Sequence, residues 1–255
     1  MRVVTYNING IRASGRKGIE NWLIQTSPEI VCFQEVRASE QQLRQVLFNF
    51  LLDYELFFNP GNRAGYSGVA VLIKKGFKYE LKCVKGSLPS LSYDLEGRVL
   101  LCDFGKFVLI NVYVPNGSRL EYKMEFLRNL KNEIKQILSE GKKLIVVSDF
   151  NIAHTEEDVS FPKSARLRTG FLDEERLMFD EFLDLGLVDA YRIFNSGNAF
   201  SWSSYRAKQG FKNAWTYRFD YIFISENLKD YVKNSNIFLD VFCSDHFPVY
   251  CDFAL

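Results

Sequence analysis

The stretch "VFCSDHFPV" sets a carboxylate, Asp245, directly before an imidazole, His246, one of only two histidines in 255 residues. Further carboxylates and amides stand at the ends or starts of apolar, strand-like runs: Asn7, Glu35, Asp149, Asn151 and Asp220. Taken singly, such a residue is more often a cap or a turn residue. Taken together, they form an oxygen-rich donor set that suits Mg²⁺ or Mn²⁺ rather than zinc.

A lone imidazole beside a cation site can stabilise a developing oxyanion or orient a nucleophile. A second carboxylate would fix the tautomer of His246 and raise its pKa, and Asp220 is the candidate for that role. The pattern therefore predicts metal-assisted hydrolysis of a phosphoester. The other histidine, His154 in "NIAH", could equally be structural.

These side chains can act together only if the strands that carry them meet at one sheet edge, where ligands collect in α/β folds. Strands are expected at residues 2–8, 29–35, 68–75, 142–149, 217–225 and 247–254, with two more, hinged near Gly105, within 98–114. Helices are expected at 19–26, 39–50, 119–141 and 173–186. One face of the third helix is apolar: Leu120, Met124, Leu127, Leu130, Ile134 and Ile137. So many strands predict an α/β fold with two stacked mixed sheets flanked by helices.

Composition limits the environment and the partners. Lys and Arg number 32 against 31 acidic residues, so a polyanion would need cations concentrated on one face. The five cysteines are scattered and lack a C-x-x-C pair, as is typical of buried thiols in a reducing compartment. "MRVVTYNING" turns polar too soon for a targeting leader, and no apolar run reaches membrane-spanning length. We therefore expect a soluble intracellular protein, in the cytoplasm or nucleoid.

Ten stretches, in order, resemble the exonuclease III family of class II abasic-site endonucleases, within the endonuclease/exonuclease/phosphatase superfamily: "YNINGIRA", "CFQEVRA", "GYSGVAVL", "LEGRV", "NVYVPNG", "SDFNIAH", "GFLDEER", "FSWSSYR", "RFDYIFIS" and "SDHFPV". The resemblance implies one domain over residues 1–255, folded as a four-layer α/β sandwich with a catalytic crevice at one end. It also implies a DNA repair nuclease dependent on Mg²⁺ or Mn²⁺. Such an enzyme hydrolyses the phosphodiester 5′ to abasic sites and has 3′-phosphodiesterase and 3′→5′ exonuclease activity. Its partner is double-stranded DNA with abasic sites or blocked 3′ ends, and we expect a monomer without a membrane partner.

The resemblance also implies roles for single residues. The metal ligands are Glu35, Asp245 and Asn7. The catalytic residues are Asp149, Asn151, Asp220, His246 and Tyr113. In this scheme Asp149 and Asn151 position or deprotonate the attacking water, and His246 donates to the scissile phosphate. The substrate-binding residues are Asn116, Arg98, Trp202, Tyr217, Phe219, Lys163 and Arg206, with Arg98 as a structural or backbone-facing member. The general base and the number of metal ions stay open.

Lesion preference is open as well. An abasic sugar must rotate out of the duplex, and Trp202, Tyr217 and Phe219 are expected to wall its pocket unless they are only core aromatics. Lys163 and Arg206 lie in basic stretches that could contact phosphates or could simply be solvated. Compared with the family it resembles, "PKSARLRTGF" lacks the asparagines, and "NAWTYRFDY" has either Thr216-Tyr217 in place of the usual Gly-Trp or a one-residue shift. The balance between abasic-site incision, 3′-end trimming and incision at modified bases could therefore differ here.

Two alternatives remain. The same fold could act mainly as a 3′→5′ exonuclease or on another phosphoester, such as an inositol phosphate or RNA. A non-catalytic DNA-binding scaffold is the other alternative. The presence of Glu35, Asp149, Asp220, Asp245 and His246 argues against the scaffold.

Overall fold

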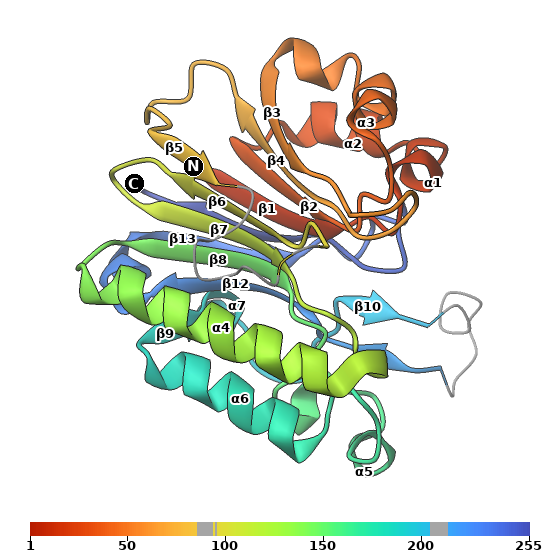
Figure 1. Cartoon of the computed structure of the whole chain (residues 1–255), viewed down its shortest axis with the longest axis vertical. Coiled ribbons are helices and arrows are strands. Elements are labelled where there is room, and N and C mark those ends of the chain that lie inside the picture. Colours follow the sequence, from red (N-terminus) through yellow and green to blue (C-terminus); the bar gives the residue numbers. More distant parts are fainter. Residues whose placement is uncertain (86–93, 95, 205–213) are drawn as a thin grey trace.

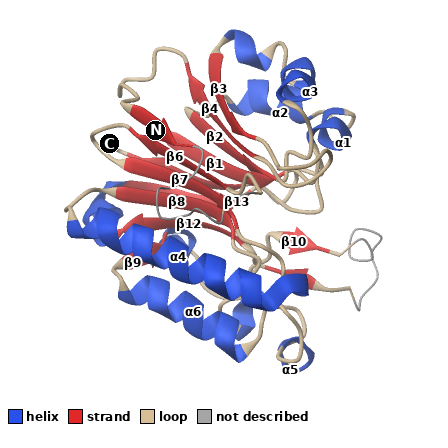
Figure 2. Ribbon diagram, in the orientation of Figure 1, coloured by secondary structure: helices blue, strands red, loops and turns tan. Residues whose placement is uncertain are grey.

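The structure, a computed structural model, describes residues 1–85, 94, 96–204 and 214–255. Within these residues, two six-stranded mixed sheets stack face to face (Figures 1 and 2). The first sheet has the order β13-β14-β1-β2-β4-β3 and the second β5-β6-β7-β8-β12-β9. The first comprises β1 Arg2–Asn7, β2 Ile30–Gln34, β3 Tyr54–Asn59, β4 Val69–Lys74, β13 Val232–Ile237 and β14 Val249–Phe253. The second comprises β5 Cys83–Lys85, β6 Val99–Asp103, β7 Val108–Tyr113, β8 Leu144–Asp149, β9 Leu187–Asp189 and β12 Asp220–Ser225.

Helices cover both outer faces of the stack, which confirms the predicted sandwich (Figure 1). The first sheet is covered by α1 Ile11–Gly15, α2 Ile19–Thr26 and α3 Glu40–Val46. The second is covered by α4 Leu120–Ser139 and α6 Asp173–Asp184. Shorter elements are α5 Pro162–Ala165, α7 Ala190–Phe194, the two-residue strands β10 Trp202–Ser203 and β11 Thr216–Tyr217, and the 3₁₀ turns Phe50–Leu52, Gly117–Arg119, Glu156–Asp158 and Glu226–Tyr231.

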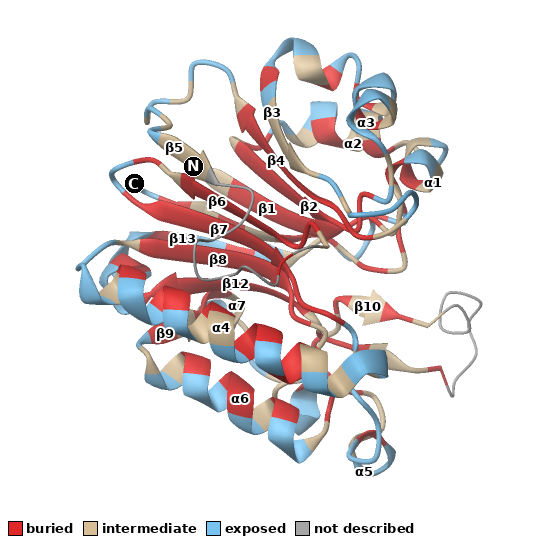
Figure 3. Cartoon of the chain, viewed as in Figure 1, coloured by how far each residue is buried: buried red, intermediate tan, exposed pale blue. Residues whose placement is uncertain are grey.

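The apolar side chains bury themselves in layers that match these elements. The predicted face of α4, from Met124 to Ile137, packs on the outer face of the second sheet. Between the two sheets lies a second cluster that includes Cys32, Val71, Leu109, Ile145 and Ile222. The central strands are therefore buried on both faces, while the outward sides of the helices stay exposed (Figure 3). Burial on both faces explains why runs such as "LIVV" are continuously apolar rather than alternating.

Strand direction brings the polar strand ends to one edge. β1 runs parallel to β2, and β7 runs parallel to β8, so their last residues lie at the same end of the stack. β12 is antiparallel to β8, with Asp220 directly opposite Asp149. β14 is antiparallel to β1, so the loop before it reaches the same edge. The predicted convergence of strand ends is thus a consequence of sheet register.

Several elements differ from the sequence-based expectation. The helix expected over 39–50 ends at Val46, a 3₁₀ turn follows at Phe50–Leu52, and the next run, Tyr54–Asn59, forms the strand β3. The strand expected over 217–225 is split into β11 and β12 by Arg218 and Phe219. β13 has no predicted counterpart, because its sequence "VKNSNI" is polar, as suits an edge strand.

The cysteines follow the prediction in the main. Cys32, Cys102, Cys243 and Cys251 are buried thiols that form no disulfide, whereas Cys83 is partly exposed. Among the residues described, no helix combines the length and the apolar character needed to cross a membrane.

Candidate active site

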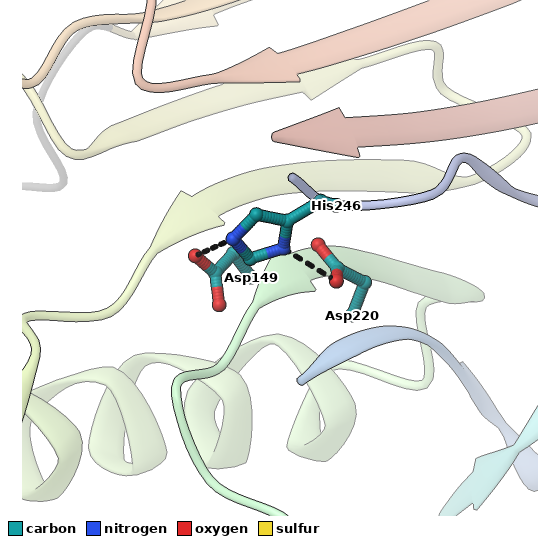
Figure 4. A group of neighbouring side chains, drawn as sticks. All are labelled: Asp149, Asp220 and His246. Atoms are coloured by element: carbon teal, nitrogen blue, oxygen red, sulfur yellow. Dashed lines mark hydrogen bonds and ion pairs between the residues drawn. The ribbon is translucent and has the colours of Figure 1, made fainter. Parts of the chain in front are cut away.

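An imidazole lies between two buried carboxylates at the edge where the strands converge (Figure 4). His246 Nδ1 is 2.8 Å from Asp220 Oδ2, and its Nε2 is 3.9 Å from Asp149 Oδ2. His246 is 6% exposed, and both aspartates are 1% exposed. Donation of Nδ1–H to Asp220 fixes the orientation of the ring and directs Nε2 toward Asp149 and the mouth of the site.

Burial and charge set opposite tendencies on these groups. Burial lowers the pKa of His246, but the negative charges of Asp220 and Asp149 outweigh it and raise this pKa to about 10. Burial, together with the negative charges of Asp220 and Glu35, raises the pKa of Asp149 to about 7, against the lowering effect of His246. At neutral pH the imidazole is therefore protonated, and Asp149 can both accept and release a proton. Groups poised in this way are typical of acid–base catalysis.

One amide links two carboxylates from different sheets. Asn7 Nδ2 donates to Glu35 Oε1 at 3.0 Å and to Asp149 Oδ2 at 2.7 Å. Glu35 is also ion-paired with Arg37. Asn7, at the end of β1, thus holds Glu35 and Asp149 close enough together to contact the same bound ion or substrate group.

Asp245 is held from two sides. Its Oδ1 accepts from Asn9 Nδ2 at 2.9 Å, and its Oδ2 accepts from Trp202 Nε1 at 3.0 Å. Burial raises the pKa of Asp245, but the charge of His246 and these two hydrogen bonds outweigh that effect and lower the pKa below its usual range. Asn9 also donates its backbone N–H to Asn7 Oδ1 at 3.0 Å, so Asn9 connects two of the three predicted metal ligands, Asn7 and Asp245.

Two sets of donors could hold a metal ion here. Asp149, Asp220 and His246 offer ligand atoms within 4.8 Å of one another. A protonated imidazole has no free lone pair for a cation, however, and the carboxylate and amide oxygens around Asn7 do not have this limitation. A cation at those oxygens would also offset the negative charges of Asp220 and Glu35, which, after burial, raise the pKa of Asp149. The donor chemistry therefore fits a hard divalent cation such as Mg²⁺.

Backbone strain is concentrated at this edge. Asn9, Glu35, Arg37 and Asn151 all have positive φ, between 43° and 52°. Non-glycine residues adopt this region rarely, and they cluster there at functional sites. These residues lie just after β1, β2 and β8, where the chain turns sharply and the polar side chains converge.

Tyr113, the last residue of β7, stands beside the carboxylates. Burial first, and then the charges of Glu35 and Asp149, raise the pKa of its phenol well above the usual value, so it is a hydrogen-bond donor. Arg98 does not lie at the surface as a substrate contact would. It is 2% exposed, with its guanidinium 4.6 Å from the centre of the Tyr113 ring and bonded to Glu96 and to Tyr66 at 2.8 Å each. Glu96 and Tyr66 fix the Arg98 guanidinium in place, and the guanidinium in turn packs against the ring of Tyr113.

A pocket of about 540 Å³ opens next to the carboxylates. Asn116, Asn151, Trp202, Tyr217 and Phe219, all predicted site residues, line it. Trp202 pairs with Tyr217 across the β10–β11 ladder, and the Tyr217 ring stacks on Phe219 with centroids 4.7 Å apart. The structure therefore brings the predicted aromatic residues together on one side of the catalytic edge.

Two residues singled out in the sequence lie away from this pocket, and a third is outside the part of the chain that the structure describes. Lys163 is exposed on α5 and does not line the pocket. Arg206 lies outside the described residues. His154 stacks on Phe179 and bonds to Asp180 at 2.6 Å, both on α6, which makes it a structural residue.

Sequence reasoning missed three residues of this region. Asn9, two positions after Asn7, repeats the spacing of Asp149 and Asn151 and could have been found by it. Trp215 lines the pocket, and its indole centroid is 4.5 Å from the guanidinium of Arg168, which belongs to the basic stretch "FPKSARLR" proposed for phosphate contacts and also lines the pocket. Ser201 Oγ donates to Asp220 Oδ2 at 2.7 Å. Ser201 carries no sequence signal, because this contact depends on the packing of the chain before β10 against β12.

The sequence and the fold are both similar to those of known nucleases. A sequence profile described as the "Endonuclease/Exonuclease/phosphatase family" matches residues 4–246. An "Exodeoxyribonuclease" of Bacillus subtilis is 35% identical over 257 residues, which cover 98% of each chain. A "DNA-(apurinic or apyrimidinic site) endonuclease" of Dictyostelium discoideum is 30% identical and is matched over 98% of this chain and 69% of its own length. In fold, a 3′-5′ exonuclease of Neisseria meningitidis superposes over all of both chains with a TM-score of 0.88 at 24% identity.

Proposed function

The chain belongs to the endonuclease/exonuclease/phosphatase family, and from this membership we propose that it is a metal-dependent DNA repair nuclease. It hydrolyses the phosphodiester on the 5′ side of an abasic site and trims blocked 3′ ends. The observation that carries the proposal is His246 held between Asp220 and Asp149, with Glu35, Asn7 and Asp245 at the same edge. The relatives named as an exodeoxyribonuclease and an abasic-site endonuclease support the choice of DNA.

His246 is the proposed donor to the scissile phosphate. Hydrolysis gathers negative charge on the phosphoryl oxygens and the leaving 3′-oxygen, and a protonated imidazole stabilises such charge. Asp220 keeps the imidazole protonated and oriented, since it accepts from Nδ1. The phenol of Tyr113 is a second donor at the same edge.

Asp149 is the proposed acceptor of the proton from the attacking water. Its pKa of about 7 suits a general base near neutral pH. Asn151 holds Asp149 Oδ1 through its backbone N–H at 3.0 Å, and its side-chain amide donates to Val114 O at 3.0 Å. These bonds position the amide and the carboxylate for one water molecule.

Glu35, Asn7 and Asp245 are the proposed residues for Mg²⁺ or Mn²⁺. When bound, the ion supplies positive charge that polarises the phosphate and stabilises the leaving oxygen. Asn9 and Trp202 orient Asp245 through its two oxygens. Such outer partners commonly fix the geometry of a ligating carboxylate.

The aromatic pocket is the proposed site of lesion selection. An abasic nucleotide leaves the duplex at low cost because it has no base to unstack. Trp202, Tyr217 and Phe219 then form an apolar wall for the sugar, and Asn116 and Arg168 lie at the rim. The same pocket could receive the terminal nucleotide of a 3′ end, which would account for both activities.

The proposed enzyme is a single-domain monomer. Residues 1–255 act as one domain, since β14 pairs directly with β1. A monomer is sufficient, because both sheets of one chain supply the catalytic edge. A DNA substrate also implies that the enzyme works inside the cell, in the cytoplasm or nucleoid.

The test uses a duplex with one internal abasic analogue, with Mg²⁺ or with chelator. An undamaged duplex and a duplex with a recessed, blocked 3′ end are run beside it. We expect Mg²⁺-dependent incision 5′ to the lesion that leaves a 3′-hydroxyl, abolished by Glu35→Ala. Trimming without internal incision would assign the enzyme to 3′ ends alone. Failure to cut any DNA, with hydrolysis of an inositol phosphate or RNA, would refute the proposal.

A further inference from the structure

A fully buried ion pair lies directly behind the catalytic edge. Lys123 on α4 and Glu175 on α6 both have side chains that are 0% exposed, and Lys123 Nζ is 2.6 Å from Glu175 Oε1. Lys123 Nζ also donates to the backbone carbonyl of Asn151 at 2.7 Å. The second oxygen, Glu175 Oε2, accepts the backbone N–H groups of Gly170 at 2.6 Å and Leu172 at 3.0 Å.

These contacts link the pair to two walls of the site. Asn151 holds Asp149 through its backbone N–H and also lines the aromatic pocket. Gly170 lines the same pocket and accepts from the backbone N–H of Ala153 at 2.8 Å. Gly170 has a φ of +90°, and a Cβ there would come within 3.0 Å of Phe219. The loop is therefore seated closely against the pocket wall, and Glu175 holds it there.

Stability alone is a poor explanation for such a pair. Removing two charges from water costs more than their attraction commonly returns, and apolar replacements of similar volume are often neutral or stabilising. Here the charged atoms face backbone groups of two loops rather than only each other. The ammonium fixes one carbonyl and the carboxylate fixes two N–H groups, which apolar side chains could not do.

We propose that Lys123 and Glu175 are positioning residues, which hold the Asn151 loop and the Gly170 loop in register for hydrolysis. The proposal rests on the function proposed above. Neither residue reaches the substrate. Lys123 acts through Asn151 on the placement of Asp149 and the water, and Glu175 acts through Gly170 on the pocket. A misplacement of about 1 Å in such a site can cost on the order of 10²-fold in rate.

The test replaces the whole pair with apolar residues, Lys123→Met with Glu175→Met. This double variant removes both charges together, so it avoids leaving one charge unpaired in the core. The matched control is Lys131→Met with Glu181→Met, because Lys131 and Glu181 also pair α4 with α6, but at the surface. Thermal melting, kcat and KM on the abasic duplex are measured with Mg²⁺ for wild type and both variants.

We expect the control to stay within about twofold of wild type in kcat. The Lys123/Glu175 double variant should melt below wild type, because three backbone groups lose their partners, but should stay folded at the assay temperature. It should then lose on the order of 10²-fold in kcat with a smaller change in KM. A stable double variant with the kcat of the control would overturn the proposal, since the pair would then be structural only.

Glu175→Gln decides the question if the double variant does not fold. The amide keeps the shape of the side chain but sets N–H donors against those of Gly170 and Leu172, or against Lys123. We expect a rise of at least about fivefold in KM for the abasic duplex, and unchanged kcat and KM would contradict the proposal. Inactive wild-type protein would refute the proposed function instead, and the same variants would then be compared on the phosphoester that wild type does cleave.

Discussion

At the scale of single residues, the carboxylate of Asp220 makes the largest contribution to keeping the His246 ring protonated. Asp220→Asn keeps the shape but removes the negative charge, so the pKa of His246 should fall from about 10. Because the protonated ring is the proposed donor to the phosphate, that donor would then be lost at a lower pH. We expect kcat to fall on the order of 10²-fold, with a larger loss at pH 9 than at pH 6.

The measurement combines a pH–rate profile with NMR titration of the His246 ring. Ser201→Ala is a useful companion, since it removes a neutral hydrogen bond to Asp220 and leaves the charge in place. An Asp220→Asn profile parallel to that of wild type would show that Asp220 does not control the protonation of His246.

Trp202 has two separable roles in this site. Its ring lines the pocket, and its Nε1–H donates to Asp245 at 3.0 Å. Trp202→Phe keeps an aromatic wall but removes the donor. We expect the Mg²⁺ concentration for half-maximal activity to rise about 10-fold, as is typical when a partner of a ligating carboxylate is lost. Trp202→Ala should in addition raise KM for the abasic duplex. An unchanged Mg²⁺ requirement in Trp202→Phe would remove Asp245 from the proposed ligands.

The placement of most proposed site residues could be predicted, because the direction of a strand determines the sheet edge at which its terminal residues lie. Asn7, Tyr113 and Asp149 each end a strand, and Asp220 begins one. Contacts made across the fold had no such signal. Arg98 is enclosed by Tyr66 and Glu96, and that enclosure depends on how the 66–68 segment packs against the residues before β6.

At the scale of elements, an ionic cluster joins the start of β6 to the turn before α4. Glu96 accepts from Arg98 at 2.8 Å and from Arg119 at 2.8 Å and 2.9 Å. Burial raises the pKa of Glu96, but these two arginines outweigh it and lower the pKa to about 2. A carboxylate with a depressed pKa stabilises the fold above its unfolded value, near 4.5, and this contribution is lost as the pH falls toward 2.

Glu96→Gln should therefore destabilise the protein by about 1–2 kcal/mol at pH 7, because it weakens hydrogen bonds to charged groups. The difference from wild type should shrink toward zero near pH 2. Urea unfolding at pH 7, 4 and 2.5 measures it. A difference that is the same at all three values would contradict the assigned cause. Glu140→Gln is a suitable control, since Glu140 pairs with Lys142 at the surface.

Elements with strong periodicity were predictable, and those shaped by their neighbours were not. The bounds of α2 agree with the pattern, since its ends are marked by Gly18 and Ser27, both in left-handed conformation. β13 exists because β14 offers it backbone groups to pair with, although its own sequence is polar. Edge strands of this kind depend on tertiary pairing more than on propensity.

At the scale of the whole molecule, the site belongs to neither sheet alone. Asn7 ends a strand of the first sheet and Glu35 directly follows another, whereas Asp149 and Asp220 belong to strands of the second. The bond from Asn7 to Asp149 crosses between them. Correct stacking of the two sheets is therefore a condition for the proposed activity, and the apolar cluster between them positions the proposed catalytic groups as well as stabilising the fold.

The charge of the whole chain leads to the last prediction. A net charge of +1 gives DNA no general attraction, so binding must depend on cations near the catalytic edge. Arg168 is exposed and lines the pocket, whereas Lys106 is exposed in the β6–β7 turn at the opposite end of β7 from Tyr113. Each phosphate contact contributes about 0.9 to the slope of log K against log salt. We expect Arg168→Gln to weaken binding of the abasic duplex, measured without metal by fluorescence anisotropy across a salt series, and to reduce the slope by about one. Lys106→Gln should leave affinity and slope unchanged. If both substitutions changed the affinity and the slope equally, the duplex would not lie across the pocket. General electrostatics, rather than a local contact with Arg168, would then govern binding.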